Sequence, residues 1–294
     1  SRVIPPPTEE QLLRAARAAL AEARRLGLTG IQDISSERDL RVYQLLAERG
    51  ELTARFYCRT PLPRWQELAR VGVRANFGGD LIKIGSLKGF MDGSLGSTTA
   101  VFFEPYTDAL HTTGLFNAMA IPLEKMEKMV LEADRAGLQL SIHAIGDRAN
   151  SLLLDMLEKA IAQNGPRDRR FRVEHAQHIH PKDFARFARL GAIASVQPYH
   201  AIDDGRWADR RIGPERAMNT YAFRSFLDAG VKLAFGSDWT VAPLSPLLGI
   251  YAAVTRATLD GKRPQGWVPV IESLTIEKQC FSRGPSMGSI VNRQ

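Results

Sequence analysis

Five polar side chains stand at or just beyond the ends of short apolar segments, where catalytic groups gather if those segments are parallel strands. They are Lys88, His143, His175, His200 and Asp238. Imidazole nitrogens and carboxylate oxygens are good ligands for a divalent metal, and zinc suits this set best. A metal held there would make a bound water more acidic and polarise a carbonyl. Carbamylation of the lysine into a carboxylate-like ligand would explain an ammonium at a buried strand end, which is otherwise costly.

Each of these residues also has an ordinary structural interpretation. A single histidine in an apolar strand is commonly a hydrogen-bonded core residue, and Lys88 can simply extend its ammonium to solvent. Asp238, in the segment GSDW, can cap a following helix. The metal interpretation is favoured because the residues share one position, the end of several separate strands.

The segments that position these residues repeat one order: helix, glycine stop, apolar strand, polar residue. This pattern predicts strands around 28–34, 52–58, 81–90, 138–143, 171–175, 192–197 and 231–236. It predicts helices around 8–27, 36–49, 64–72, 122–136, 148–163, 181–190 and 214–229. Alternating helices and strands favour a parallel α/β sheet, and polar residues at the strand ends favour a TIM-like (β/α)8 barrel. A doubly wound sheet is the alternative, but no glycine fingerprint follows the first strand. A closed barrel needs eight strands, so the seven predicted strands indicate an incomplete one.

Composition excludes several other classes of protein. With 294 residues, 44 % of them apolar and 24 % charged, the chain is an ordinary globular sequence. A net charge of +7 permits acidic partners, but the basic residues are scattered among acidic ones, which disfavours nucleic-acid binding. No apolar run reaches the roughly 18 residues of a membrane span and the start lacks signal-peptide order, so we expect a cytoplasmic protein. Cys58 and Cys280 form no CxxC, which predicts neither a disulfide framework nor a cysteine zinc site.

Four segments together resemble the metal-dependent amidohydrolase superfamily, and most closely its YtcJ-like branch, which includes N-substituted formamide deformylases. They are GSLKGFMDGSLGSTTA, LQLSIHAIGDRAN, FRVEHAQHIHPKDFARFARLGAIASVQPYH and LAFGSDWTVAPLSPLLGIYAAVTR. The resemblance runs from about residue 10 to residue 278. It implies a barrel domain over residues 1–278 that contains strands two to eight of the family's fold. It also implies metal-dependent hydrolysis of C–N bonds in small amides or cyclic amides.

The resemblance assigns roles residue by residue. Lys88 matches the fourth-strand lysine, His143 and His175 match the fifth- and sixth-strand ligands, and Asp238 matches the eighth-strand aspartate. In the family this aspartate binds metal and carries the proton of the attacking water. Four further polar residues near the strand ends are predicted to bind or orient substrate: His200, Gln197, Asp92 and Asp147. Helix capping is the alternative for the two aspartates, and Trp207 and Trp239 either line the pocket or pack.

The chain also departs from the family pattern. No His-x-His pair precedes Lys88, no terminal β-sandwich is recognisable, and residues 279–294 form a tail that does not resemble the family. His178 and His180 do form such a pair, but beyond the sixth strand, and they are interpreted as surface or loop residues. A barrel without its first strand has two unpaired edges, so we expect a homo-oligomer and impaired activity. A non-catalytic remnant that binds a ligand or partner is the alternative.

Overall fold

The computed structural model describes residues 5–267 and 272–275. Within these ranges the strands are β1 Gly30–Ile34, β2 Arg55–Pro61, β3 Phe77–Gly78, β4 Ile82–Phe90, β5 Gln139–Ala144, β6 Arg172–His175, β7 Ile193–Val196 and β8 Leu233–Phe235. All seven predicted strands are therefore present. The two-residue β3 was not predicted, because two residues are too few to show a period.

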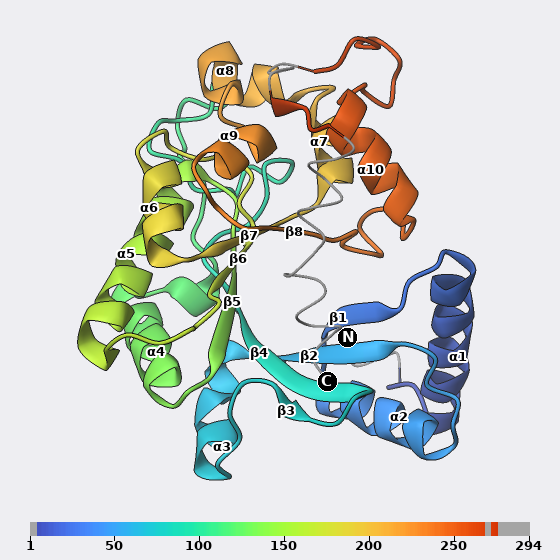
Figure 1. Ribbon diagram of the computed structural model, residues 1–294. Coiled ribbons are helices and arrows are strands. Elements are labelled where there is room, and N and C mark those ends of the chain that lie inside the picture. Colours follow the sequence, from blue (N-terminus) through green and yellow to red (C-terminus); the bar gives the residue numbers. More distant parts are fainter. Residues whose placement is uncertain (1–4, 268–271, 276–294) are drawn as a thin grey trace.

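These strands form one sheet that curls into an incomplete barrel (Figure 1). Seven of them are parallel, in the order β1-β2-β4-β5-β6-β7-β8, and β3 pairs antiparallel with β4. Within the described residues β1 pairs only with β2, and β8 pairs only with β7. The predicted α/β fold with an incomplete barrel is confirmed, and the opening lies between β1 and β8.

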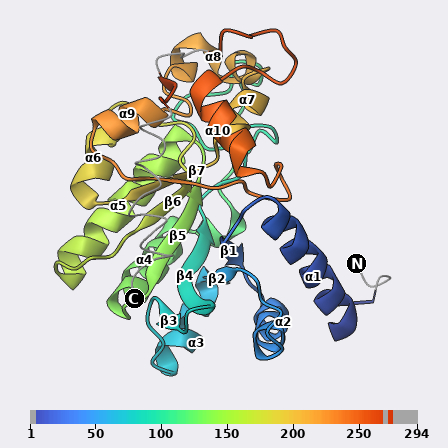
Figure 2. The ribbon, with the colours of Figure 1, turned by 45° about the vertical axis from the view of Figure 1, so that its right-hand side comes forward.

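Helices cover the sheet from outside (Figures 1 and 2). The α-helices of the described residues are α1 Glu9–Arg25, α2 Glu37–Glu48, α3 Trp65–Arg70, α4 Leu123–Arg135, α5 Asp147–Asn164, α6 Asp183–Leu190, α7 Pro198–Asp204, α8 Ala208–Ala217, α9 Phe223–Asp228 and α10 Pro246–Thr255. Short 3-10 turns cover Leu62–Arg64 and Ala118–Ala120. The main core lies between β4 to β8 and α4 to α9. A second, smaller apolar cluster joins α1 and α2 to β2 and includes Leu20, Leu46 and Cys58.

Local sequence explains where the first helices begin. Thr8 accepts a hydrogen bond from the Gln11 amide while the Gln11 side chain accepts one from the Thr8 amide. Ser36 and Asp39 form the same reciprocal pair at the start of α2. Such a capping box satisfies two amides that the first helical turn leaves unpaired. Residues in the first turn therefore fix where each of these two helices begins, independently of the rest of the fold.

One predicted helix is wrong as a continuous element. In place of a single helix over 214–229, the chain forms α8 and α9 with a break at residues 218–222. The backbone turns left-handed at Tyr221, with φ of 51°, and an α-helix cannot continue through that conformation. Gly213, with φ of 79° before Pro214, adds a kink inside α8. The break brings residues 218–222 against the segment that follows β6.

No helix within residues 5–267 and 272–275 combines the length and the apolar character needed to cross a bilayer. The predicted domain boundary at residue 278 and the predicted tail over 279–294 lie outside the described residues.

Candidate functional site

The carboxyl ends of β4 to β8 meet at one edge of the curled sheet, since these strands are parallel. Side chains alternate between the two faces of each strand, so residues in register share a face. Lys88 of β4 is in register with Ser141 of β5, and His143 with Glu174 of β6, whereas His175 lies one position further, opposite Ala144. Gln197 follows β7 directly, and Asp238 follows β8 after two residues. The fold therefore collects polar side chains from four strand ends.

The structure brings His175, His200 and Asp238 together. One ligand atom of each residue lies within 4.8 Å of the other two. His200, on α7, has its Nε2 atom 3.2 Å from Asp238 Oδ2, and this hydrogen bond is the first reason that the pKa of Asp238 is lowered. His175 and Asp238 have φ of 74° and 59°, which is strained for these residue types and turns the chain sharply where each strand ends. Two imidazoles and an ionised carboxylate at this spacing fit a divalent metal.

Lys88 and His143 border this group. Lys88 is buried, 3 % exposed, and its ammonium lies 4.7 Å from the centroid of the Phe90 ring. Among the described residues no carboxylate oxygen lies within 4.0 Å of that ammonium. Burial lowers the pKa of Lys88 to about 8. The His143 and His175 rings are in contact, with centroids 4.5 Å apart.

The predicted ligand set is thus assembled only in part. His175 and Asp238 lie within ligand distance of each other, while His143 contacts His175 without joining the three-residue group. His200, predicted to bind substrate, is the third member of that group. Burial, followed by the neighbouring His143 and Lys88, lowers the pKa of His175 well below its usual range. His175 is therefore a neutral imidazole, the form that binds a metal.

The two predicted aspartates are engaged with backbone amides. Asp92 is 1 % exposed and accepts hydrogen bonds at 2.9–3.0 Å from the amides of Val101, Ile145 and Gly146. It therefore joins the loop after β4 to the loop after β5, which suits an orienting role better than contact with substrate. Asp147, at the start of α5, accepts from the Phe103 amide at 3.0 Å, and its burial raises its pKa.

Gln197 is buried beside His175. Its Oε1 atom lies 2.8 Å from His175 Nδ1, and its Nε2 atom donates to the Ser195 carbonyl at 3.1 Å. Within the described residues its amide is therefore bonded to protein groups at both ends. This geometry favours a role in holding His175 over the predicted direct contact with substrate.

A charged cluster beneath the strand ends was not predicted. Glu174 is buried and accepts hydrogen bonds from Ser141 at 2.6 Å, Arg172 at 3.0 Å and Ser195 at 2.9 Å, and Arg59 lies 3.3 Å from it. Burial alone would raise the pKa of Glu174, but Arg172 and Arg59 hold it well below its usual range. The available sequence signal was a pair of opposite charges two residues apart in one predicted strand, Arg172 and Glu174, which places both side chains on the same face.

His178 lies in the loop after β6, as one of the two predicted alternatives had it, but it is not a surface residue. His178 is 2 % exposed, and its Nδ1 atom lies 2.8 Å from the Thr220 hydroxyl in the break between α8 and α9. Burial lowers its pKa to about 3, so it is a neutral core residue. The sequence pattern missed this because the burying segment lies 42 residues away. His180 is only partly buried, and the side chain of Trp239 is 48 % exposed.

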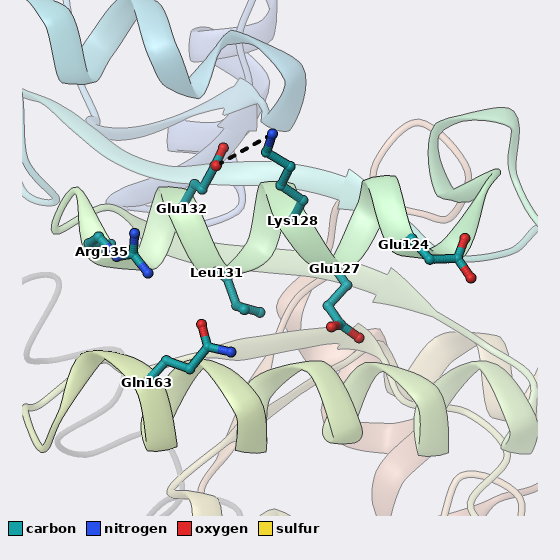
Figure 3. A pocket seen from close by; sticks show the side chains of 7 residues that line it. All are labelled: Glu124, Glu127, Lys128, Leu131, Glu132, Arg135 and Gln163. Atoms are coloured by element: carbon teal, nitrogen blue, oxygen red, sulfur yellow. Dashed lines mark ion pairs between the residues drawn. The ribbon is translucent and has the colours of Figure 1, made fainter.

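A hollow on the outer surface lies between α4 and α5 (Figure 3). Its lining contains the surface ion pair Lys128–Glu132 and none of the strand-end residues. The lining residues are Glu124, Glu127, Lys128, Leu131, Glu132, Arg135 and Gln163. The hollow is therefore separate from the predicted site residues.

The fold is that of metal-dependent hydrolases. The structure of an uncharacterised metal-dependent hydrolase from Pyrococcus horikoshii superposes on 97 % of this chain with a TM-score of 0.83 and 27 % identity. The chain covers 56 % of that protein. Residues 1–284 match the amidohydrolase family, and the chain belongs to this family.

Three named proteins are similar in sequence to most of this chain. Protein LONG AFTER FAR-RED 3 of Arabidopsis thaliana is 37 % identical over 273 residues, covering 88 % of this chain and 45 % of that protein. The putative amidohydrolase YtcJ of Bacillus subtilis is 30 % identical over 264 residues, covering 87 % and 48 %. The N-substituted formamide deformylase of Arthrobacter pascens is 28 % identical over 219 residues, covering 71 % and 39 %. The expected resemblance is confirmed, and the chain spans less than half the length of each of these relatives.

Proposed function

We propose that this chain carries most of the catalytic centre of a metal-dependent hydrolase that cleaves carbon–nitrogen bonds other than peptide bonds. The observation that carries the proposal is the meeting of His175, His200 and Asp238 within 4.8 Å at the carboxyl edge of the sheet of an amidohydrolase-family chain. The named deformylase relative supports a small amide as the substrate class.

Zinc is the proposed metal, held by His175 and Asp238 with His200 or His143, and with Lys88 once carbamylated. When bound, it would acidify a water and polarise the substrate carbonyl. Asp238 takes a proton from the attacking water as the water oxygen bonds to the carbonyl carbon. It returns that proton to the nitrogen as the C–N bond breaks. Its lowered pKa, set first by the hydrogen bond from His200, keeps it ionised for the first transfer.

The test is elemental analysis of the purified chain together with hydrolysis of a panel of N-substituted formamides. Lys88→Ala is the informative variant, and Lys83→Ala, near the start of the same strand, is the matched control. About one equivalent of zinc in the wild type and the control, lost in Lys88→Ala, supports the centre. Folded wild-type protein that takes up no metal overturns it.

A second candidate function is a non-catalytic member of the family that binds a ligand or partner through the same strand ends. It is favoured by the partial assembly of the predicted ligand set, since His143 lies outside the three-residue group. Metal binding without hydrolysis of any amide in the panel would support this alternative.

Self-association is also proposed, because within the described residues β1 pairs with β2 alone, which leaves an edge of the sheet open. Sedimentation analysis tests it, and a monomer at all accessible concentrations would contradict it.

A further inference from the structure

We propose that Gln197 is a positioning residue that holds His175 in the Nδ1–H tautomer, so that its Nε2 lone pair is the one offered to a metal. The inference rests on the proposed function for its purpose, but the tautomer itself is a property of the metal-free chain. It also replaces the expected role of Gln197 as a substrate ligand.

The direction of the Gln197 amide follows from its second partner. A backbone carbonyl can only accept a hydrogen bond, so the atom facing the Ser195 carbonyl at 3.1 Å is the amide NH2. The amide oxygen therefore faces His175 Nδ1 at 2.8 Å. An amide oxygen has no hydrogen to donate, so the hydrogen in this contact belongs to the imidazole. In a neutral ring the other nitrogen, Nε2, then carries the lone pair.

The surroundings make this arrangement rigid. Gln197 is 6 % exposed and follows β7 directly, so its backbone is held by the sheet. His175 ends β6 in a left-handed conformation, and the following Ala176 is left-handed as well, with φ of 43°. The side chain of His175 is therefore aimed by a strained turn and fixed by one strong hydrogen bond. Partners of this kind, one step removed from a metal, set both the ring orientation and the ligand basicity of histidine.

The neighbouring His143 has the opposite hydrogen-bond arrangement. Its Nε2 atom lies 2.8 Å from the Gly93 carbonyl and 3.4 Å from an Asp92 carboxylate oxygen, so Nε2 carries a hydrogen, and the ring in its neutral form presents Nδ1. Gly93 adjoins Asp92, whose three backbone hydrogen bonds fix the position of this loop. Gly146, whose amide donates to Asp92, has no room for a side chain, because a Cβ there would lie 2.0 Å from the Val101 carbonyl oxygen. The contact between the loops after β4 and β5 is therefore tightly packed. Two adjacent histidines thus offer different nitrogens.

The first experiment needs no variant. Long-range nitrogen–proton NMR spectra of metal-free protein labelled with nitrogen-15 histidine report the tautomer of each ring, with His175→Asn used only to assign the signals. The expected result is Nδ1–H for His175 and Nε2–H for His143. Observation of Nε2–H at His175 in the wild type overturns the proposal.

The second experiment measures zinc affinity by competition with a chromogenic chelator. Gln197→Leu removes the acceptor and is expected to weaken zinc binding by about 10- to 100-fold and to release His175 from the Nδ1–H tautomer. Gln197→Glu keeps the acceptor for His175 but loses the donor to the Ser195 carbonyl, so it is expected to retain the Nδ1–H tautomer and to bind zinc more tightly than Gln197→Leu does. The matched control is Gln139→Leu, a change of equal size at an 8 % exposed glutamine that bonds Tyr57 and the Arg170 carbonyl.

The outcomes separate this inference from the proposed function. If wild-type protein binds no zinc, the proposed function fails, while the NMR result still decides whether Gln197 sets the tautomer. If wild-type protein binds zinc but Gln197→Leu changes neither affinity nor tautomer, the positioning role fails and the metal centre stands. If Gln197→Leu does not fold, the wild-type spectra and Gln197→Glu carry the decision.

Discussion

Two buried parts of the barrel handle charge in opposite ways. In the interior, Glu174 is paired with Arg172 and Arg59 and bonded to two hydroxyls, and its pKa is held well below the usual range. At the strand ends, Lys88 has no carboxylate within 4.0 Å among the described residues, and burial lowers its pKa to about 8. Burial disfavours both charges. The two arginines outweigh burial at Glu174, whereas at Lys88 the carboxylates of Glu174 and Asp238, beyond 4.0 Å, do not.

The same comparison can be made between two buried carboxylates, Asp204 and Glu174. Asp204, at the end of α7, has the Tyr221 hydroxyl at 2.6 Å and the Gln177 amide at 3.4 Å as hydrogen-bond partners, and no basic group within 4.0 Å in the described chain. Burial raises its pKa to about 6, whereas arginine neighbours lower the pKa of Glu174. Burial is shared by the two groups, so the presence of a cation decides the direction of the shift.

The largest expected effect is on activity at the strand ends. Asp238→Asn removes the group proposed to carry the proton, and we expect hydrolysis of the best formamide substrate to fall by about 10²- to 10⁴-fold. Steady-state kinetics with unfolding curves measured in parallel test this. The exposed Asp168→Asn is the control. Retention of a third or more of wild-type activity by Asp238→Asn would remove Asp238 from the mechanism.

The next effect is on stability in the interior. Glu174→Gln leaves Arg172 and Arg59 without their carboxylate, and removing one partner of a buried ion pair costs about 3–5 kcal/mol. Urea unfolding followed by circular dichroism measures the loss. A change no larger than that of a surface variant would mean that the interior charges are not coupled as the distances indicate.

A smaller, pH-dependent effect is expected at Asp204. Its pKa in the folded state is above its ordinary value of 3.8, so its contribution to stability is fully present below about pH 3.8 and is lost as the pH rises through about 6. The Asp204→Asn side chain cannot ionise, so the variant does not lose this stability, and its amide oxygen can still accept the hydrogen bond from the Tyr221 hydroxyl. Relative to wild type, the variant should gain about 2–3 kcal/mol between pH 4 and pH 7.5. Parallel stability curves for the two proteins over this range would argue against a raised pKa.

The smallest effect is expected on the outer surface. Lys159 and Glu127 form an ion pair of 2.7 Å between α5 and α4, and both side chains are substantially exposed. Glu127→Gln should leave the unfolding midpoint unchanged within error, since solvent screens exposed pairs. This variant also serves as the surface control for Glu174→Gln. A loss of stability as large as that of Glu174→Gln would mean that the surface ion pair contributes as much as the interior one.

The sequence determined most of the elements, because their signals are local, but it did not reveal the break between α8 and α9. Capping boxes begin α1 and α2, and β-branched apolar runs mark the seven parallel strands. Strand ends then identify Lys88, His143, His175 and Asp238 as neighbours, since parallel strands place their carboxyl ends at one edge.

Only the tertiary structure decided how these residues are partnered. The closeness of His200 to Asp238, the hydrogen bond of Gln197 to His175 and the burial of His178 against Thr220 join residues 22 to 42 positions apart. The ion pairs of Glu174 with Arg59, and its hydrogen bond from Ser141, likewise cross between strands. No local period encodes such contacts, because they depend on the curl of the sheet and on left-handed turns at His175, Tyr221 and Asp238. A sequence can name the groups at a strand end, but their tautomers and charge states follow from neighbours that only the fold supplies.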